Sequence, residues 1–486
     1  MHIIHIASEI APIAKIGGLG DVLLGLPREQ SRLKNDVDLF LPKYDCMDTA
    51  PVRDLHILDS SVEVEWEGVK HKNTIWVGWL DSIKIYFIDP QHPKLFFNRG
   101  CIYGCDDDVD RFIYFSKAAL ETIKALQLKP QILHLHDWHT AAVALFCKEM
   151  YTVPAGLVYS IHNLQYQGLT QSIALEHAGL DPLKLKRFAD DAQPELLNLM
   201  KTGILCSDKV TTVSCTYARE IQTEEHGMGL SKILAENGHK VRGIINGVDY
   251  NYWNPEKDPL LPAAYSPRIE PKDEKDRATL DRKGFVKKFL REKLALDEAH
   301  RPLVGVVARL VPQKGVHLIE HALYRTLEKH GQFVLLGTTQ IPSINREFHD
   351  LMHKFAEHPH VRLTLKHEEE LAHLIFGGAD IFLVPSIFEP CGLTQLIAMK
   401  YGAIPVVRHT GGLADTVHDL DHPEGNGYVF QEPTPKGFNT AFDRAVEDWY
   451  ERPAWWRETV ERVMQLDYSW KKPALEYLEL YGKVVP

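Results

Sequence analysis

Two basic residues follow an apolar run in the second half of the chain. Arg309 and Lys314 come after Leu303 to Val307 and before a segment of helical period. Open α/β sheets bind ligands at the carboxyl ends of their strands, which is where this placement puts both cations. Arginine offers a planar fork and lysine a point charge, a combination that suits two adjacent phosphates. The pair predicts a diphosphate site, because unpaired cations at a helix start oppose the helix dipole.

A glycine-rich turn near the N-terminus offers a second anion site. Lys15 precedes Gly17 and Gly18, and Asp21 closes this segment between an apolar strand and a helix. Glycines let backbone N–H groups approach a ligand at a helix N-terminus, where anions are favoured. A tight turn with a solvated lysine explains this segment alone equally well. The spacing is not that of the dinucleotide-binding fingerprint.

A carboxylate lies at another strand end. Glu389 follows the apolar run Ile381 to Val384 and precedes an apolar helix, which residues 391 to 394 open. A helix-capping role is one interpretation of Glu389. In the favoured interpretation its carboxylate accepts hydrogen bonds from sugar hydroxyls, while the amides of residues 392 to 395 hold phosphate.

The densest polar cluster is the segment from His134 to His139, at a strand end in the first half. Taken as metal ligands, His134 and His136 alternate onto one strand face and are joined by Asp137 and His139, as in a metal-dependent hydrolase. No second ligand cluster follows a similar strand end in the sequence, as a mononuclear site would need. A polar strand end that hydrogen-bonds its own backbone is a third interpretation.

Uncharged polar residues end the following strand. His162 and Asn163 come after Leu157 to Ile161, and their imidazole and amide groups suit neutral hydroxyls better than charges. Asn246 stands further along, in a turn at the expected hinge.

The elements that must position these residues alternate along the chain. Short apolar runs separated by segments of helical period predict parallel sheets wrapped by helices. The predicted strands are Ile3 to Ala7, Val37 to Leu41, Ile132 to Leu135, Leu157 to Ile161, Val210 to Val213, Leu303 to Val307, Val334 to Leu336, Ile381 to Val384 and Ile404 to Val407. Residues 62 to 88 instead predict antiparallel hairpins. A stretch rich in proline, asparagine and aspartate, from Asn246 to about Pro271, predicts the domain boundary.

The composition narrows the class of protein. A chain of 486 residues, 44% hydrophobic and 25% charged, predicts two folded domains. The net charge of −11 is spread without a long basic block, so neither nucleic acid nor membrane is an expected partner. Seven scattered cysteines predict reduced thiols, and a strand pattern that starts at His2 predicts neither a signal peptide nor a membrane span. We therefore expect a cytoplasmic protein.

Taken together and in this order, these segments resemble the bacterial glycogen synthases and the related starch synthases, which are retaining glucosyltransferases of the two-Rossmann-domain type. The resemblance runs nearly end to end. Its strongest stretches are Lys15 to Asp21, His134 to His139, Ile161 to Gly168, Ile245 to Asp249, Arg309 to Gly315, Phe388 to Gln395 and Thr410 to Thr416.

The resemblance implies an α/β fold of GT-B type, with two Rossmann-like, doubly wound domains that face each other across a cleft. Residues 1–248 would form the N-terminal domain, on the acceptor and glucosyl side, and residues 249–465 the nucleotide-sugar-binding domain. A C-terminal helix within 466–486 would cross back to the first domain.

The implied reaction is transfer of glucose from ADP-glucose or UDP-glucose to the non-reducing end of an α-1,4-glucan such as glycogen. Configuration would be retained, and neither a metal nor another cofactor would be needed. The implied catalytic residues are Asp137, His162, Arg309, Lys314 and Glu389. The implied nucleotide-sugar contacts are Lys15, Gly17, Gly18, Asp21, Asn163, Asn246, Cys391, Gly392, Leu393 and Thr394. Tyr103 and Trp138 would touch the acceptor.

Three positions depart from the family pattern. Ile16 replaces a hydroxyl residue in the glycine loop, and Lys366 stands where these synthases often have a tyrosine that stacks on adenine. The preference between ADP-glucose and UDP-glucose therefore stays open. Ile397 occupies the position of a second carboxylate in the broader pattern, which this family generally lacks.

Two other functions stay open at this stage. One is a metal-dependent hydrolase centred on residues 134 to 139, and the other is a non-catalytic sensor of nucleotide sugars or glucans with the same fold. A sensor would have no need of Arg309 and Lys314 as leaving-group cations.

Overall fold

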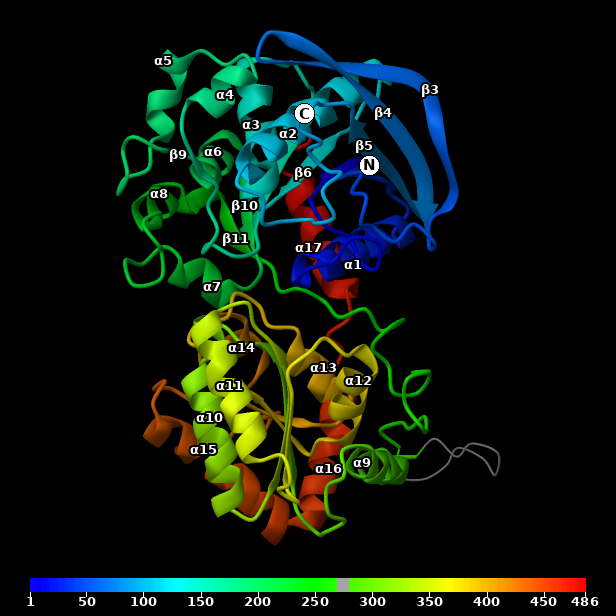
Figure 1. Cartoon of the computed structure of the whole chain (residues 1–486), viewed down its shortest axis with the longest axis vertical. Coiled ribbons are helices and arrows are strands. Elements are labelled where there is room, and N and C mark those ends of the chain that lie inside the picture. The colour runs from blue at the N-terminus through cyan, green and yellow to red at the C-terminus, as the bar shows by residue number, and fades with distance from the viewer. Residues whose placement is uncertain (269–278) are drawn as a thin grey trace. The chain divides into compact units, whose positions relative to one another are not determined.

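The computed structural model describes residues 1–268 and 279–486. The chain divides into two compact units (Figure 1): unit 1 comprises Met1–Gly247 and Trp470–Pro486, and unit 2 comprises Val248–Ser469. The division lies at the start of the predicted boundary stretch. The far end of that stretch, Pro271, is outside the described residues.

Unit 1 is built on a nine-stranded sheet with the order β11-β10-β7-β6-β1-β2-β5-β4-β3. Its strands are β1 (His2–Ile6), β2 (Asp36–Pro42), β3 (Arg53–Trp66), β4 (Val69–Leu80), β5 (Ile83–Pro90), β6 (Ile132–His136), β7 (Gly156–Ile161), β10 (Lys209–Thr212) and β11 (Val241–Gly243). Pairing is parallel from β11 to β5 and antiparallel from β5 to β3. The chain reverses its winding direction between β1 and β6, so a switch point lies at their carboxyl ends.

The helices of unit 1 cover both faces of this sheet. They are α1 (Gly18–Arg32), α2 (Asp108–Ala125), α3 (Trp138–Glu149), α4 (Ile173–His177), α5 (Pro182–Leu185), α6 (Leu199–Cys206), α7 (Cys215–Glu220), α8 (Ser231–Glu236) and the C-terminal α17 (Lys471–Tyr481). A small antiparallel pair, β8 (Leu169–Thr170) with β9 (Leu197–Asn198), precedes α6.

The first and last helices of the chain lie side by side in unit 1 (Figure 1). A Cβ atom on Gly25 of α1 would lie only 1.9 Å from Nε1 of Trp470, so a glycine is needed for this close approach. The hydroxyl of Tyr481, the last residue of α17, lies 2.7 Å from Nδ1 of His134 on β6. The C-terminal helix is thus fixed to the core of unit 1, as the fold prediction expects.

Unit 2 has a six-stranded, all-parallel sheet with the order β14-β13-β12-β15-β16-β17. Its strands are β12 (Leu303–Arg309), β13 (Gln332–Thr338), β14 (Val361–Thr364), β15 (Ile381–Val384), β16 (Ile404–Arg408) and β17 (Tyr428–Phe430). The winding direction reverses between β12 and β15, which places this unit's switch point at their carboxyl ends.

The helices of unit 2 are α9 (Asp281–Lys293), α10 (Val316–Glu328), α11 (Pro342–Lys354), α12 (Glu369–Gly378), α13 (Thr394–Lys400), α14 (Gly411–Thr416), α15 (Pro435–Glu451) and α16 (Pro453–Met464). Helices α10 and α11 lie on one face of the sheet, and α12, α13 and α16 lie on the other (Figure 1). Both units are therefore doubly wound α/β structures, which confirms the predicted fold class.

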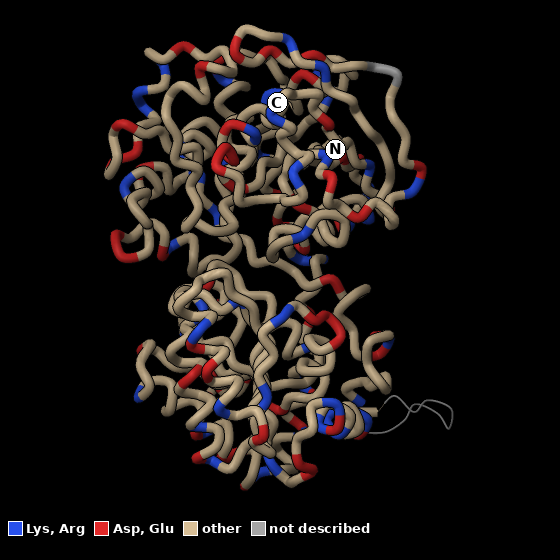
Figure 2. The backbone as a smooth tube through the Cα atoms, viewed as in Figure 1, with Lys and Arg blue, Asp and Glu red and all other residues tan. Residues whose placement is uncertain are grey.

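The nine predicted strands all form, and residues 62 to 88 belong to the antiparallel part of the first sheet. Figure 2 shows Lys and Arg interspersed with Asp and Glu along both units. Within the described ranges, no helix is long and apolar enough to cross a membrane.

Candidate functional site

Most of the predicted site residues lie at the carboxyl edge of each sheet, close to its switch point. In unit 1 they follow β1, β5, β6, β7 and the edge strand β11, and in unit 2 they follow β12 and β15. Because neighbouring parallel strands end at the same edge, loops far apart in the sequence meet there. Each unit has its own cluster.

The glycine loop of unit 1 is organised by a buried carboxylate. Oε2 of Glu9 accepts hydrogen bonds from the backbone nitrogens of Ile16, at 2.8 Å, and Gly17, at 2.9 Å. Lys15 pairs with Asp21 at 2.7 Å. In this structure the amides of Ile16 and Gly17 are therefore bound by Glu9. A carboxylate this deeply buried needs hydrogen-bond donors, and the loop supplies them.

Asp137 has the most strained backbone of the predicted residues. It lies between β6 and α3 with φ of 57° and ψ of −177°, a region that essentially only glycine adopts and that costs roughly 1–3 kcal/mol. Its Oδ1 accepts hydrogen bonds from the backbone nitrogen of His162 at 2.7 Å and of Asn163 at 3.4 Å. Strain that persists beside a polar cluster makes Asp137 a candidate functional residue.

The electrostatics of this cluster are set by burial. Loss of solvation raises the pKa of the Asp137 carboxyl to about 7, against the two backbone hydrogen bonds that lower it. Loss of solvation also lowers the pKa of His162 to about 3. At neutral pH the imidazole is therefore uncharged, as the sequence prediction of a site for neutral hydroxyls requires.

The loop after β7 carries three amide side chains, Asn163, Gln165 and Gln167, and the imidazole of His162. Oδ1 of Asn163 accepts from the backbone nitrogen of Gln165 at 3.0 Å, which folds the loop into a turn. Nε2 of His162 lies 3.0 Å from Nδ1 of His136. The second ring nitrogen of His162 makes no hydrogen bond within the described part of the chain.

The two predicted acceptor residues belong to one aromatic stack. The ring of His139 stacks on Trp138 at 4.1 Å and on Tyr103 at 4.8 Å, measured between ring centroids. The hydroxyl of Tyr103 donates to Oε1 of Glu9 at 2.9 Å and lies 2.7 Å from Oγ of Ser8. Glu9 thus connects the glycine loop to the aromatic stack.

Asn246 follows β11 at the end of unit 1. Its side chain is buried, and its Oδ1 has no hydrogen-bond partner among the described residues. A buried amide oxygen without a partner loses free energy, so an unsatisfied one points to a ligand.

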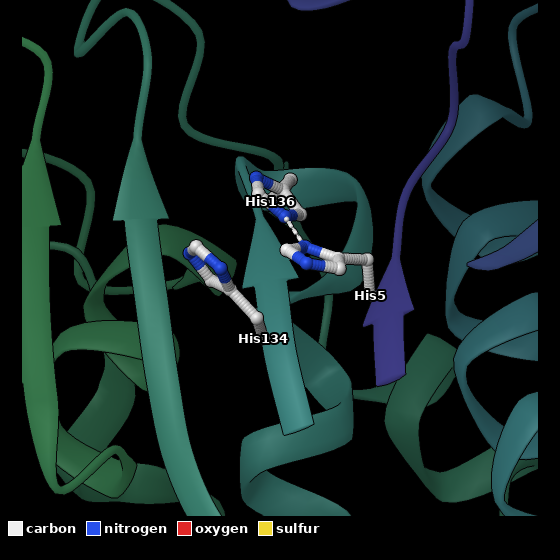
Figure 3. Close-up of side chains that lie close together, drawn as sticks. All are labelled: His5, His134 and His136. Atoms are coloured by element: carbon white, nitrogen blue, oxygen red, sulfur yellow. Dashed lines mark hydrogen bonds between the residues drawn. The ribbon is translucent and has the colours of Figure 1, made fainter. Parts of the chain in front are cut away.

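The histidines of β6 gather with a third from β1 (Figure 3). His5 and His134 are register partners on adjacent parallel strands, and His136 lies two residues further along the same face. One nitrogen from each of the three lies within 4.8 Å of the others. The hydrolase hypothesis instead grouped His134 and His136 with Asp137 and His139.

That predicted ligand set is not brought together. Asp137 binds backbone N–H groups, and His139 lies in the aromatic stack. Both ring nitrogens of His5, His134 and His136 already make hydrogen bonds. This arrangement does not favour the hydrolase hypothesis, because a metal would have to displace those partners.

The cluster in unit 2 is charged. Nζ of Lys314 lies 2.5 Å from Oε2 of Glu389, and Oγ of Ser386 donates to the same oxygen at 2.8 Å. The Glu389 residue is only 5% exposed. The Glu389 carboxylate thus accepts hydrogen bonds from two side chains, and among the described residues it accepts none from the backbone N–H groups of α13, so it does not cap that helix. Lys314 and Glu389 neutralise each other.

Close backbone packing brings the two loops of unit 2 together. Gly315 has φ of +69°, and a Cβ atom there would lie 2.2 Å from the carbonyl oxygen of Pro385. The backbone nitrogen of Ile387 donates to the carbonyl oxygen of Gln313 at 2.8 Å. The loop after β12 is thus bound to the loop after β15.

Arg309 and residues 391 to 394 complete this edge. The side chain of Arg309 is exposed, and it has no ion pair or hydrogen bond within the described ranges. Cys391 is buried, and Gly392, Leu393 and Thr394 are half-buried at the start of α13. Gln395 ties this turn to α14, because its Nε2 donates to the carbonyl oxygen of Gly392 at 2.8 Å and to Oγ1 of Thr416 at 3.2 Å.

Two family models match the chain. The starch synthase catalytic domain matches residues 2–236, and glycosyl transferases group 1 matches residues 286–462. A glycogen synthase of Protochlamydia amoebophila (strain UWE25) is 52% identical over 497 residues, covering 100% of this chain and 99% of the relative. The chain belongs to the glycogen synthase and starch synthase family.

Solved structures of similar proteins agree with this family. The catalytic domain of starch synthase IV from Arabidopsis thaliana, bound to ADP and acarbose, is 46% identical with a TM-score of 0.94, over 100% of this chain and 99% of that one. Sucrose-phosphate synthase from Thermosynechococcus elongatus shares the fold alone, at 17% identity and a TM-score of 0.60 over 99% of each chain.

Membership in the glycogen synthase and starch synthase family makes the chain a glycosyltransferase, so the sensor and hydrolase hypotheses are not favoured.

Sequence reasoning missed Glu9, Ser386 and His5 as parts of the two clusters. The other residues were predicted because they are polar and follow a strand. Glu9 follows β1 and Ser386 follows β15, so the same criterion would have found both. His5 needed the adjacency of β1 and β6.

Proposed function

We propose that this chain transfers glucose from ADP-glucose to the non-reducing end of an α-1,4-glucan, with retention of configuration and without a metal. The observation that carries the proposal is the 52% identity to a glycogen synthase over the full length of this chain. The solved structure of the related starch synthase catalytic domain contains bound ADP. We therefore assign ADP as the nucleotide of the donor.

The charged cluster of unit 2 receives the leaving group in this proposal. Arg309 and Lys314 bind the diphosphate, whose negative charge grows as the bond to glucose breaks. Fixed cations stabilise such developing charge strongly, because they need no reorganisation during the reaction. Lys314 already lies 2.5 Å from Glu389, so the incoming diphosphate replaces or shares that partner and frees the carboxylate for sugar hydroxyls.

The same cluster holds the rest of the nucleotide sugar. Residues Cys391, Gly392, Leu393 and Thr394 lie at the start of α13, where backbone N–H groups point toward the diphosphate in our proposal. In unit 1, Lys15 adds a cation and Asp21 faces the nucleoside, while Gly17 and Gly18 keep the loop backbone close to the ligand.

The neutral cluster of unit 1 orients the glucosyl group. Asp137, His162 and Asn163 are already held together by hydrogen bonds at the ends of β6 and β7. Asn246 offers a buried amide oxygen without a partner among the described residues. The amide groups of Asn163 and Asn246 and the neutral imidazole of His162 can bind sugar hydroxyls without adding charge. Tyr103 and Trp138 are assigned to the acceptor side.

The chemistry balances without a protein nucleophile. The bond between glucose C1 and the phosphate oxygen breaks, and a bond from C1 to the O4 of the acceptor forms on the same face. The proton of that acceptor hydroxyl passes to the departing phosphate oxygen. This scheme differs from the two-carboxylate route of retaining glycosidases.

Incorporation of radiolabelled glucose into glycogen tests the proposal. The purified protein is given ADP-glucose or UDP-glucose in parallel, with EDTA present. We expect metal-independent transfer from ADP-glucose. Absence of transfer from both donors by the folded protein would reject the proposal, and faster transfer from UDP-glucose would correct the nucleotide.

A matched pair of variants locates the site in the same assay. Arg309→Gln should lower the rate, because it removes a diphosphate ligand. Arg346→Gln is the control, since Arg346 is also an exposed arginine of unit 2 but lies on α11. Equal rates in the two variants would remove Arg309 from the site.

A further inference from the structure

A continuous chain of hydrogen bonds runs from His162 into the core of unit 1. Nε2 of His162 lies 3.0 Å from Nδ1 of His136, and Nε2 of His136 lies 3.0 Å from Nδ1 of His5. Nε2 of His5 then lies 2.8 Å from Oε1 of Gln30 on α1. We call these four residues the imidazole relay. Each ring uses its Nε2 toward the next member.

The far end of the relay is fixed by the C-terminal helix. Nε2 of Gln30 donates to the hydroxyl of Tyr481 at 3.1 Å, so the amide presents its oxygen to His5. The Tyr481 hydroxyl in turn lies 2.7 Å from Nδ1 of His134, whose Nε2 lies 2.7 Å from Oγ of Ser160. Gln30 and Tyr481 are completely buried, so water does not compete for these groups.

A neutral imidazole has one donor and one acceptor nitrogen. Because the amide oxygen of Gln30 only accepts, His5 must carry its proton on Nε2 and accept at Nδ1. His136 then donates from Nε2 and accepts at Nδ1, and His162 donates from Nε2. The orientation of the Gln30 amide therefore determines which nitrogen carries the proton in all three rings.

Burial keeps the rings of the relay neutral. Loss of solvation lowers the pKa of His5 to about 4 and that of His162 to about 3, and it lowers the pKa of His136 well below the usual range. A protonated ring would donate from both nitrogens and meet another donor. The hydrogen-bond geometry and the neutral state thus require each other.

We infer that Gln30 and Tyr481 are positioning residues that fix His162 in the tautomer with the proton on Nε2. Nδ1 of His162, which has no partner within the described residues, is then always a hydrogen-bond acceptor. It can take a hydrogen bond from a sugar hydroxyl. This last step rests on the proposed function, whereas the tautomer itself does not.

Nitrogen NMR of the full-length protein tests the inference directly. With histidine labelled at the ring nitrogens, the shifts report which nitrogen carries the proton, and His162→Asn identifies the signals of His162. We expect the wild type to show Nε2 protonated and Nδ1 not. A wild-type His162 with the proton on Nδ1, or with a mixture of tautomers, would overturn the inference.

Variants at the far end provide the causal test. Tyr481→Phe frees the Gln30 amide to turn, and Gln30→Met removes the acceptor, so both should give His162 shifts between those of the two tautomers. Gln30→Glu keeps an acceptor toward His5 and should restore the wild-type shifts. Unchanged single-tautomer shifts in both Tyr481→Phe and Gln30→Met would overturn the role of these residues.

Tyr159→Phe is the matched control. Tyr159 is also a completely buried tyrosine of unit 1, but its hydroxyl makes no hydrogen bond within the described ranges. The Tyr159→Phe variant should leave the His162 shifts and the transfer rate unchanged.

The relay variants should also change the transfer rate. Tyr481→Phe should lower kcat/KM for ADP-glucose by roughly tenfold, the effect of one neutral hydrogen bond. The kcat/KM of Gln30→Glu should be closer to the wild-type value than that of Gln30→Met.

The two proposals can fail separately. If the wild type transfers no glucose, the NMR result still decides whether the relay sets the tautomer. If the wild type transfers glucose and both Tyr481→Phe and Gln30→Met keep a single tautomer, the proposed function stands and the role of Gln30 and Tyr481 is rejected.

Discussion

The two units use the same topology to build clusters of opposite character. At the switch point of unit 1, Asp137, His162 and Asn163 are joined by hydrogen bonds that involve backbone amides and neutral rings. At the switch point of unit 2, Lys314 and Glu389 form a half-buried ion pair. The interactions of the unit 1 cluster depend on the positions of protons and lone pairs, and those of the unit 2 cluster depend on charge.

This difference separates two kinds of work in the proposed reaction. A leaving diphosphate gains charge, so the unit that binds it needs cations with fixed positions. A glucosyl group stays neutral at its hydroxyls, so the unit that orients it needs donors and acceptors with a fixed direction. Substitutions in unit 2 should therefore act through charge, and substitutions in unit 1 through geometry and tautomer.

Lys314→Ala should give the largest effect. Removal of one fixed electrostatic partner lowers kcat/KM by roughly 2–4 kcal/mol of transition-state stabilisation. The variant also leaves the carboxylate of Glu389 buried without its cation, which should cost about 1–3 kcal/mol of unfolding free energy. Radiolabel transfer and urea unfolding measure the two effects.

The double variant Lys314→Ala, Glu389→Gln separates these effects. It removes the unpaired charge, so stability should recover while transfer stays slow. Wild-type turnover in Lys314→Ala would mean that Lys314 takes no part in the reaction. The proposed difference between the two units would then be wrong.

The pH dependence of stability probes the neutral cluster. The folded state raises the pKa of Asp137 from 3.8 to about 7, so it binds this proton more tightly than the unfolded chain does. The contribution to stability is complete below about pH 4 and is lost as the pH rises through about 7. Partial exposure of Asp137 keeps this loss near 2–3 kcal/mol.

Urea unfolding of the wild type and of Asp137→Asn between pH 4 and pH 8 measures that loss. The difference in unfolding free energy between the two proteins should change in favour of Asp137→Asn as the pH rises. A difference that stays constant across this range would mean that the carboxyl titrates normally and that the unit 1 cluster is not neutral in the sense proposed.

Backbone strain at Asp137 gives a smaller effect. Asp137→Gly should be more stable than Asp137→Asn by about 1–2 kcal/mol, because glycine adopts this φ and ψ without steric conflict. Both variants should lose transfer activity, since neither keeps the carboxylate. Equal stabilities would show that the backbone at Asp137 relaxes at no cost.

The sequence predicted the strands whose core position makes them continuously apolar, such as Ile381–Val384. It did not predict Val361–Thr364 or Tyr428–Phe430, which form the edge strands β14 and β17. An edge strand is short and only partly covered, so its sequence lacks a continuous apolar run.

Most of the candidate site could be predicted from the strand ends, because parallel strands place the loops that follow them on one edge of the sheet.

Partners within each cluster could not be predicted in the same way. Lys314 and Glu389 are 75 residues apart, and the contact depends on β12 and β15 being neighbours. His5 meets His134 and His136 only because β1 lies beside β6. Strand order is a property of the whole sheet, whereas composition and periodicity describe one segment at a time.

Lys366→Tyr should have the smallest effect and acts on nucleotide choice in the charged unit. Lys366 is 67% exposed and pairs with Glu368 at 2.8 Å, just beyond the end of β14. A tyrosine at this position can stack on adenine, and one such stack contributes about 1 kcal/mol. The ratio of kcat/KM for ADP-glucose over UDP-glucose should rise by roughly fivefold. Because the substitution also removes a cation, Lys366→Met is the control: a rise in both variants would assign the change to charge, and a rise in Lys366→Tyr alone would assign it to stacking.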